Sequence, residues 1–247
     1  MISLSNKGFQ NKINNKEDFI IYKKISRINI DPIKSFINTV DKKKYSFIYE
    51  SVEGGIHRGR YSICGFDPLI VLKINNKVAN LYKKKGGKLI KIKQKSKNPF
   101  TNLENLIANL KIKISKNLPP MTSGVFGYLG YEAINYQEKI SKNKKYNNLN
   151  LPDCLLFYPR TLFIYDNHQR DLYIIKAFIK NTYSKRNTKY DLIYNEMCEN
   201  QKYITEFKYN NKKINKSKKI SLSAKSNISK ESFYKNIAKS KEYIKNG

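Results

Sequence analysis

The side chains that most often perform catalysis or bind metals are few in this chain and lie far apart. The two histidines, His57 and His168, have no second histidine or cysteine at metal-ligand spacing, so the sequence predicts no metal site. The three cysteines, Cys64, Cys154 and Cys198, are odd in number and widely spaced, which favours free thiols in a reducing cytoplasm. No Ser–His–Asp or Cys–His arrangement is indicated.

A glycine-rich segment, residues 52–59, is the most unusual local pattern. Its glycines permit backbone angles that are closed to other residues. No Gly-x-x-x-x-Gly-Lys-Ser/Thr pattern follows, so the segment does not predict a nucleotide-phosphate site. Two carboxylates, Asp166 and Asp171, bracket the polar residues 167–170, and their spacing favours capping of a turn over acid–base chemistry.

The elements that must position these residues indicate an α+β fold, with a mixed or antiparallel sheet and flanking helices. Runs rich in β-branched and aromatic residues predict strands. These runs are 17–30, 45–49, 60–68, 69–74, 77–82, 88–92, 154–157, 161–165 and 172–175. We expect Pro68 to close its strand in a turn, and Asn75-Asn76 to form a hairpin turn.

Four segments have the features of helices. Asp31 is a candidate N-cap for a helix over 33–38, with Pro32 in the first turn. Thr101 is the candidate cap of an amphipathic helix that contains Leu103, Leu106, Ile107 and Leu110. Residues 190–203 are typical of a helix, and Ser229 caps a last helix that carries an apolar face.

The composition along the chain predicts its organisation. The expected parts are an extended or disordered N-terminus (1–18), the α+β domain (19–207), a Lys/Asn/Ser-rich linker (208–227) and the first helix of a further domain (228–247). No apolar run is long enough for a membrane helix, and the polar N-terminus does not resemble a signal peptide. We therefore expect a cytoplasmic protein without a membrane partner.

The net charge of +30 raises the question of nucleic-acid binding. Only six of the 49 basic residues are arginines, the type that contacts phosphates and bases in a bidentate manner. The lysines are spread over the whole chain, and lysine, asparagine and isoleucine are enriched together, as an AT-rich coding sequence would produce. We interpret the charge as a solvated surface and predict no nucleic-acid partner.

Four segments resemble anthranilate synthase component I, and they follow one another in the order in which that family has them. They are the Glu-Ser, Gly-Arg-Tyr-Ser and Gly-Phe-Asp-Pro blocks within 50–68, the Gly-Tyr-x-Gly-Tyr-Glu stretch within 124–132, Leu-Pro-Asp at 151–153 with the strand that ends at 165–167, and the terminal helix with 241–247. The resemblance covers about residues 19–247 and implies the fold of the N-terminal portion of that family, truncated before the chorismate-binding domain.

This resemblance also implies a function. Glu50 and Ser51 would receive the ammonium of L-tryptophan in an allosteric pocket at the end of the strand, with Arg60 nearby. The sequence alternatively allows Arg60 a salt bridge with Glu50 or Glu53. The family's chorismate, Mg²⁺ and acid–base residues would lie outside this chain, on a missing half, and a glutamine amidotransferase subunit (component II) would supply ammonia.

Three other interpretations remain open at this stage. The chain could be a fragment of aminodeoxychorismate synthase component I, the related enzyme of the folate pathway. It could be a non-catalytic module that binds tryptophan, or the product of a decaying reading frame.

Overall fold

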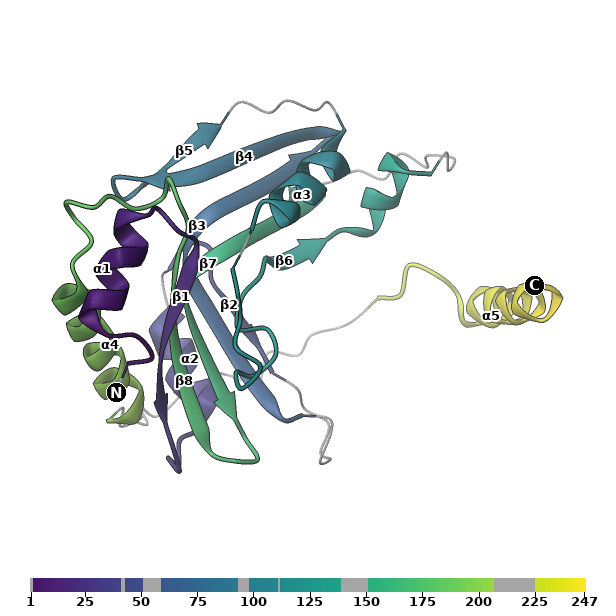
Figure 1. The fold of residues 1–247 in the computed structure, drawn as a ribbon. Helices are drawn as coiled ribbons and strands as arrows, with labels where there is room; N and C mark the ends of the chain where they lie inside the picture. Colours follow the sequence, from purple (N-terminus) through teal and green to yellow (C-terminus); the bar gives the residue numbers. More distant parts are fainter. Residues whose placement is uncertain are drawn as a thin grey trace. The chain divides into compact units, whose positions relative to one another are not determined.

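The computed structural model describes residues 2–40, 43–50, 59–92, 98–110, 112–138, 151–206 and 225–247. It divides into two units, Met1–Lys208 and Tyr209–Gly247. All strands belong to the first unit, and the described part of the second is helix α5 (Lys230–Asn246) with the residues beside it. The sheet and its helices are seen in Figure 1.

Two long antiparallel strands, β3 (Tyr61–Asn75) and β7 (Cys154–Asp166), form the axis of an eight-stranded antiparallel sheet. The other strands are β1 (Phe19–Ile25), β2 (Phe47–Tyr49), β4 (Val78–Lys85), β5 (Lys88–Ile92), β6 (Phe126–Leu129) and β8 (Asp171–Phe178). Near one end of the axis β8 and then β1 extend the sheet from β7, while β2 pairs with β3. Near the other end β4 and then β5 extend it from β3, while β6 pairs with β7.

The antiparallel sheet with flanking helices confirms the predicted α+β class, but the prediction that Pro68 ends a strand is wrong. The chain continues through it as one strand of 15 residues, and the register slips between Pro68 and Ile70. Asp67 adopts a positive φ of 58° there, and Pro68 lies opposite Pro159 of β7. Neither proline has an N–H to donate, and a bulge is one of the few places where a sheet tolerates proline.

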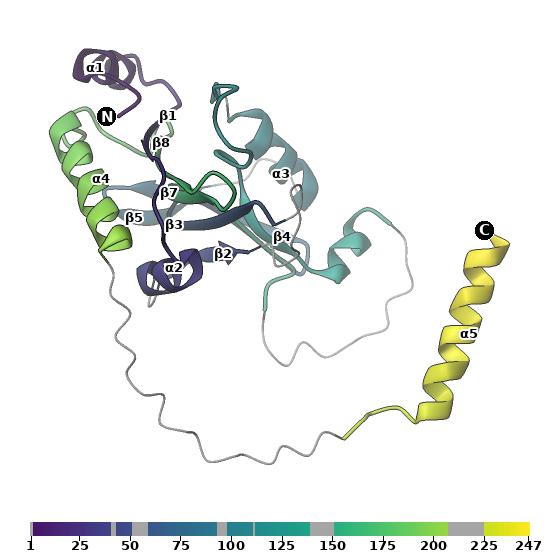
Figure 2. The ribbon, with the colours of Figure 1, turned by 90° about the horizontal axis from the view of Figure 1, so that it is seen from below.

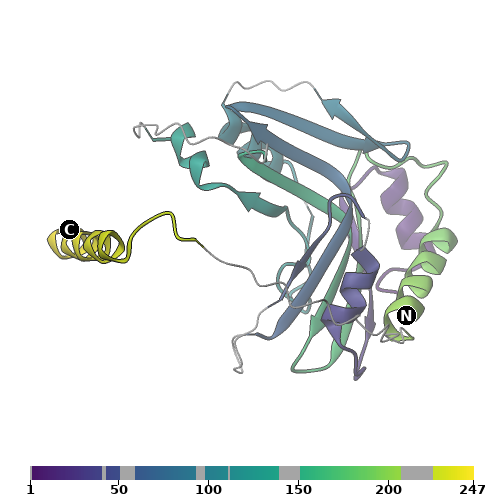
Figure 3. The ribbon, with the colours of Figure 1, turned by 180° about the vertical axis from the view of Figure 1, so that it is seen from behind.

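Helices α1 (Asn6–Asn14), α2 (Pro32–Val40) and α4 (Tyr190–Thr205) cover one face of the sheet. Figures 2 and 3 show them on the same side. The buried side chains of this layer include Phe9, Phe36, Phe163 and Met197, all with 0% exposure. As predicted, the Asp31 side chain accepts a hydrogen bond from the backbone N–H of Lys34 in the first turn of α2 (3.0 Å).

The N-terminus differs from the prediction that residues 1–18 are extended or disordered. Ser5 caps α1 by accepting a hydrogen bond from the Gly8 amide, and Phe9 and Ile13 are fully buried one helical turn apart. The polar composition of the segment conceals these two apolar positions. An i, i+4 apolar pair suffices to dock a short helix, because both side chains lie on the same helix face.

The opposite face of the sheet is covered in part by α3 (Pro99–Ala108), whose Leu106 packs with Leu72 and Ile74 of β3. Its N-cap is Asn98 rather than the predicted Thr101, because Asn98 accepts a hydrogen bond from the Phe100 amide (2.9 Å). Proline then occupies the first helical position, where no N–H is needed.

In the second unit, Ser229 caps α5 as predicted, accepting a hydrogen bond from the Ser232 amide (3.2 Å). No residue of α5 is buried within the chain, and its apolar residues Phe233, Tyr243 and Ile244 are exposed. Within the described ranges, no helix has the length and apolar character needed to cross a bilayer.

Candidate functional site

The predicted ligand residues Glu50 and Arg60 flank the same end of the β2–β3 strand pair. Glu50 directly follows Tyr49, which pairs with Ile63, and Arg60 directly precedes Tyr61, the first residue of β3. The Glu50 side chain is exposed. Ser51 and residues 52–58 lie outside the described residues, so the arrangement of a complete pocket at this end stays a prediction.

An aromatic cluster supports the strand that leads to Glu50. The rings of Phe47 and Phe126 stack with their centroids 4.6 Å apart, and Tyr49 lies 4.6 Å from Phe47 and 6.2 Å from Phe126. A Cβ at Gly65 would approach Phe47 to 2.3 Å, so a glycine is required beneath this ring. Tyr49 is 39% exposed, so part of its side chain is accessible to solvent.

Gly127 connects this cluster to β6. The Tyr49 hydroxyl accepts a hydrogen bond from the Gly127 amide (3.2 Å) and lies 3.1 Å from its carbonyl oxygen, to which it can donate. Gly127 has a φ of 145°, and a Cβ there would lie 1.9 Å from the carbonyl oxygen of Leu155. Gly127 and Phe126 of the stretch 124–132 thus serve close packing here. Tyr131 of the same stretch is 86% exposed.

Arg60 pairs with Asp166; of the two glutamates considered from the sequence, Glu53 lies outside the described residues. Its Nε lies 3.1 Å from both carboxylate oxygens, and its second terminal nitrogen is 2.7 Å from Oδ2. Asp166 also accepts hydrogen bonds from the amides of His168 and Gln169, which confirms the predicted turn cap. The Arg60 side chain is still 36% exposed. No sequence signal identifies this partner, because 106 residues separate the two.

The electrostatics of Asp166 follow from these contacts. Burial alone would raise the pKa of its carboxyl group, but the hydrogen bonds from Arg60 and from the two turn amides outweigh burial and hold the pKa below its ordinary value. The next residue, Asn167, donates from its amide to the Arg60 carbonyl (2.8 Å) and from Nδ2 to the Ser62 hydroxyl (3.0 Å). The β7–β8 turn therefore fixes the start of β3.

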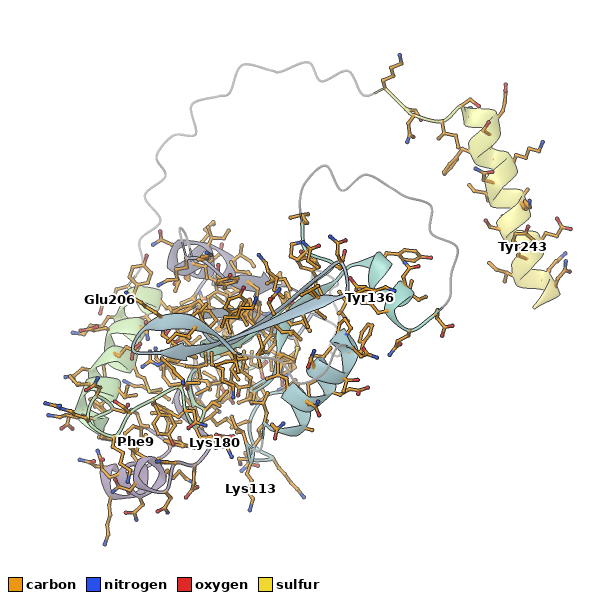
Figure 4. The ribbon with its side chains drawn as sticks, turned by 90° about the horizontal axis from the view of Figure 1, so that it is seen from above. Phe9, Lys113, Tyr136, Lys180, Glu206 and Tyr243 are labelled. Carbon is orange, nitrogen blue, oxygen red and sulfur yellow. The ribbon has the colours of Figure 1, made fainter. Side chains whose placement is uncertain are left out.

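The Leu-Pro-Asp segment, residues 151–153, forms hydrogen bonds that connect two further parts of the fold. Asp153 of the Leu-Pro-Asp segment accepts a hydrogen bond from the Asn76 amide in the β3–β4 turn (2.8 Å) and one from the Tyr136 hydroxyl. Figure 4 labels Tyr136 beside the end of the sheet. The turn itself is Asn76-Lys77, one residue later than predicted. Asp153 thus holds the short 3-10 helix Tyr131–Tyr136 against this turn.

The described residues do not fit the Mg²⁺ site that the family resemblance implies. Among them no three His, Cys, Asp or Glu side chains converge on one point. Four of the buried or half-buried carboxylates, Asp67, Asp166, Asp171 and Glu196, are each paired with a lysine or arginine. Asp153 is half-buried and accepts hydrogen bonds from Asn76 and Tyr136. Two cavities are outlined by described residues, and neither is lined by Glu50 or Arg60.

Comparison with known proteins gives the class of the chain. The model of a family described as chorismate binding enzymes matches residues 46–247, most of the chain, and the chain therefore belongs to this family. The match includes β2 to β8 of the sheet and α5, but not β1.

Particular relatives are anthranilate synthases. Anthranilate synthase component 1 of Acetivibrio thermocellus is 27% identical over 221 residues, which are 86% of this chain and 42% of that protein. The Cereibacter sphaeroides protein of the same name is 26% identical over 168 residues, or 68% and 33% of the two chains. A probable anthranilate synthase component 1 of Schizosaccharomyces pombe is 25% identical over 234 residues, or 92% and 42%.

A solved structure, anthranilate synthase component I from Streptococcus pneumoniae TIGR4, matches 90% of this chain and 46% of its own, at 18% identity and a TM-score of 0.45. The chain spans less than half the length of each of these relatives.

Proposed function

We propose that this chain is the N-terminal, tryptophan-responsive part of an anthranilate synthase component I. The observation that carries the proposal is that Glu50, whose side chain is exposed, and Arg60, whose side chain is 36% exposed, flank the same end of the β2–β3 strand pair. The motif order and the names of the curated relatives add support, and none of those quoted is an aminodeoxychorismate synthase.

The proposed ligand, L-tryptophan, has three groups that this end of the strand pair can satisfy. Its ammonium would be bound by the Glu50 carboxylate and the Ser51 hydroxyl through charge-assisted hydrogen bonds. Its indole would stack on the Tyr49 ring. Arg60, fixed by Asp166 but still partly exposed, is suited to its carboxylate.

The absence of tryptophan from this chain allows a direct binding assay. Fluorescence excited where tyrosine does not absorb reports only the added ligand, so L-tryptophan can be titrated without a label. We expect saturable binding weaker than micromolar, because we place part of the pocket outside this chain. Glu50→Gln should weaken it, whereas Glu104→Gln, an exposed glutamate on α3, should not.

Ligand analogues sharpen the assignment. Indole-3-propionate lacks the ammonium, so it should bind less tightly than L-tryptophan to the unaltered chain. In the Glu50→Gln variant the difference in affinity between the two ligands should become smaller, because only the Ser51 hydroxyl remains to bind the ammonium. Equal affinity of both ligands for the unaltered chain would refute the role of Glu50. Sub-micromolar binding of L-tryptophan would instead contradict the incomplete pocket.

The catalytic part of the proposal has its own test. We place the residues that handle chorismate and Mg²⁺ outside this chain, along with part of the contact to a glutamine amidotransferase subunit. We also place the protein in the cytoplasm. The chain alone, given chorismate, Mg²⁺ and either ammonium or glutamine, should therefore form no fluorescent anthranilate. Measurable turnover would overturn this assignment of the active site.

A further inference from the structure

A network of charged side chains connects α4 to the sheet, away from Glu50 and Arg60 in the sequence. The ammonium of Lys176 on β8 is 1% exposed and contacts the Thr161 hydroxyl at 2.8 Å and Glu196 at 2.5 Å. Arg160 donates to both carboxylate oxygens of Glu196 (2.9 and 2.8 Å). It also reaches Asp67 at the β3 bulge (3.3 Å), which is paired with Lys84 of β4.

The charges in this network do not balance. Three cations, Lys84, Arg160 and Lys176, share two carboxylates, Asp67 and Glu196. Burying a charge without a counter-charge costs free energy, so burial makes the charged form of such a group less favourable than its neutral form. Burial and the nearby Arg160 accordingly lower the pKa of Lys176 to about 8, even though Glu196 opposes the change.

A cavity of about 600 Å³ adjoins the network, within the size range of sites for small organic ligands. Its cationic side is formed by Arg160, Lys84 and Lys85, and hydroxyl groups such as that of Ser184 lie on its loop side. Its apolar side includes Leu69 and Phe178. Among the described residues that line it, none carries a carboxylate.

We propose that this cavity binds a small organic anion, whose carboxylate or phosphate group contacts Lys84, Lys85 and Arg160 and whose apolar part rests on Leu69 and Phe178. The anion would supply the negative charge that the network lacks. The electrostatic attraction is strengthened because Arg160 is only 20% exposed, and partly buried charges are screened less than surface charges.

A second cavity, of about 420 Å³, suits an anion less well. It is lined by Lys12, Lys16, Lys113 and Lys180, but also by Glu17 and Asp18. Lys12 is already paired with Glu17 (2.7 Å). Figure 4 labels Lys113 and Lys180, which lie near each other at the surface of the molecule. The carboxylates on this rim would repel the ligand that the first cavity attracts.

The experiment titrates the full chain with phenyl phosphate and with benzoate, using ligand-observed NMR, and uses benzyl alcohol as the neutral analogue. Among the described residues Lys85 has no ion-pair partner, and its side chain is exposed, so Lys85→Gln should remove a cavity cation while retaining the fold. The matched control is Lys88→Gln, because Lys88 pairs directly with Lys85 across the β4–β5 hairpin but does not line the cavity.

We expect at least one anion to bind saturably and benzyl alcohol to bind much less. Lys85→Gln should lower the affinity for the anion about two- to fivefold, which is the usual contribution of one solvent-accessible charge contact. Ser184→Glu, which introduces a carboxylate at the rim, should weaken it further. Lys88→Gln and Lys180→Gln should leave the affinity unchanged.

Several results would overturn the proposal. One is that neither anion binds, or that benzyl alcohol binds equally well. Another is that Lys88→Gln or Lys180→Gln weakens binding as much as Lys85→Gln does, because the probe would then be responding to the general positive charge of the surface or to the second cavity.

Discussion

Replacement of Glu196 by glutamine tests whether the buried network stabilises the fold through charge. Glu196 is the only residue that contacts both Arg160 and Lys176 among the recorded ion pairs of the described chain. In the Glu196→Gln variant the shape of the side chain is nearly kept, but the two cations lose their shared counter-charge. The Lys176 ammonium would retain the Thr161 hydroxyl as its partner.

The magnitude follows from the electrostatics of Glu196. Burial alone would raise the pKa of this carboxyl group, but the hydrogen bonds and charges of Arg160 and Lys176 lower it from 4.5 to about 2. Such a difference corresponds to about 3 kcal/mol if nothing screens it. Because the side chain is 36% exposed, solvent screening reduces the expected loss of unfolding free energy to about 2 kcal/mol.

The assay is urea denaturation at neutral pH, followed by far-ultraviolet circular dichroism, for Glu196→Gln, Lys176→Met and the double variant. Removing Lys176 as well eliminates one of the stranded cations, so the double variant should be more stable than the sum of the single effects by at least about 1 kcal/mol. The reasoning is refuted if Glu196→Gln costs less than about 0.5 kcal/mol, or if the two effects are additive.

Three further predictions concern stability. Lys176 has a lowered pKa in the folded state, so the unfolded chain holds more protons than the folded chain between about pH 8 and 10.5. The unfolding free energy of the unaltered chain should therefore rise with pH in this window relative to that of Lys176→Met, and urea melts at several pH values would show this. Gly127→Ala would place a Cβ 1.9 Å from the Leu155 carbonyl oxygen and should cost more than Gly124→Ala, where nothing lies within 4 Å; thermal denaturation of both variants makes the comparison. Phe9→Ala should cost about 3–5 kcal/mol in urea melts, because its ring is fully buried, whereas a disordered N-terminus would predict no effect.

The strands and helices with strong local patterns were predictable from the sequence. Asp31 and Ser229 act as helix caps because capping depends on neighbours within one turn. The continuity of β3 through Pro68 was not predictable in the same way. A proline usually ends a strand, and only the pairing of Pro68 with Pro159 reveals the bulge that accommodates both.

The candidate site shows the same division. The sequence drew attention to Glu50 and Arg60 because they belong to a block with a recognisable order of residue types. It could not identify the partner of Arg60, since Asp166 is brought there by the pairing of β7 with β3 and has no fixed spacing from it. The pairing of Lys176 with Glu196 could not be predicted from the sequence either. A lysine within an apolar strand departs from the strand pattern, but that departure does not identify the lysine's partner.

Asp67 is the residue at which the recognisable motif and the hidden network meet. In the sequence it belongs to a Gly-Phe-Asp-Pro block that is typical of a turn, but in the fold its positive φ lies within a continuous strand. Bulges redirect side chains relative to the regular alternation of a strand. At this bulge the Asp67 carboxylate contacts Lys84 of β4 and Arg160 of β7, which lie on either side of β3. The bulge therefore lies where Lys84 and Arg160, two cations of the larger cavity, share one carboxylate. A local irregularity of β3 is thus part of a charge network whose most distant member, Glu196, lies 129 residues away along the chain.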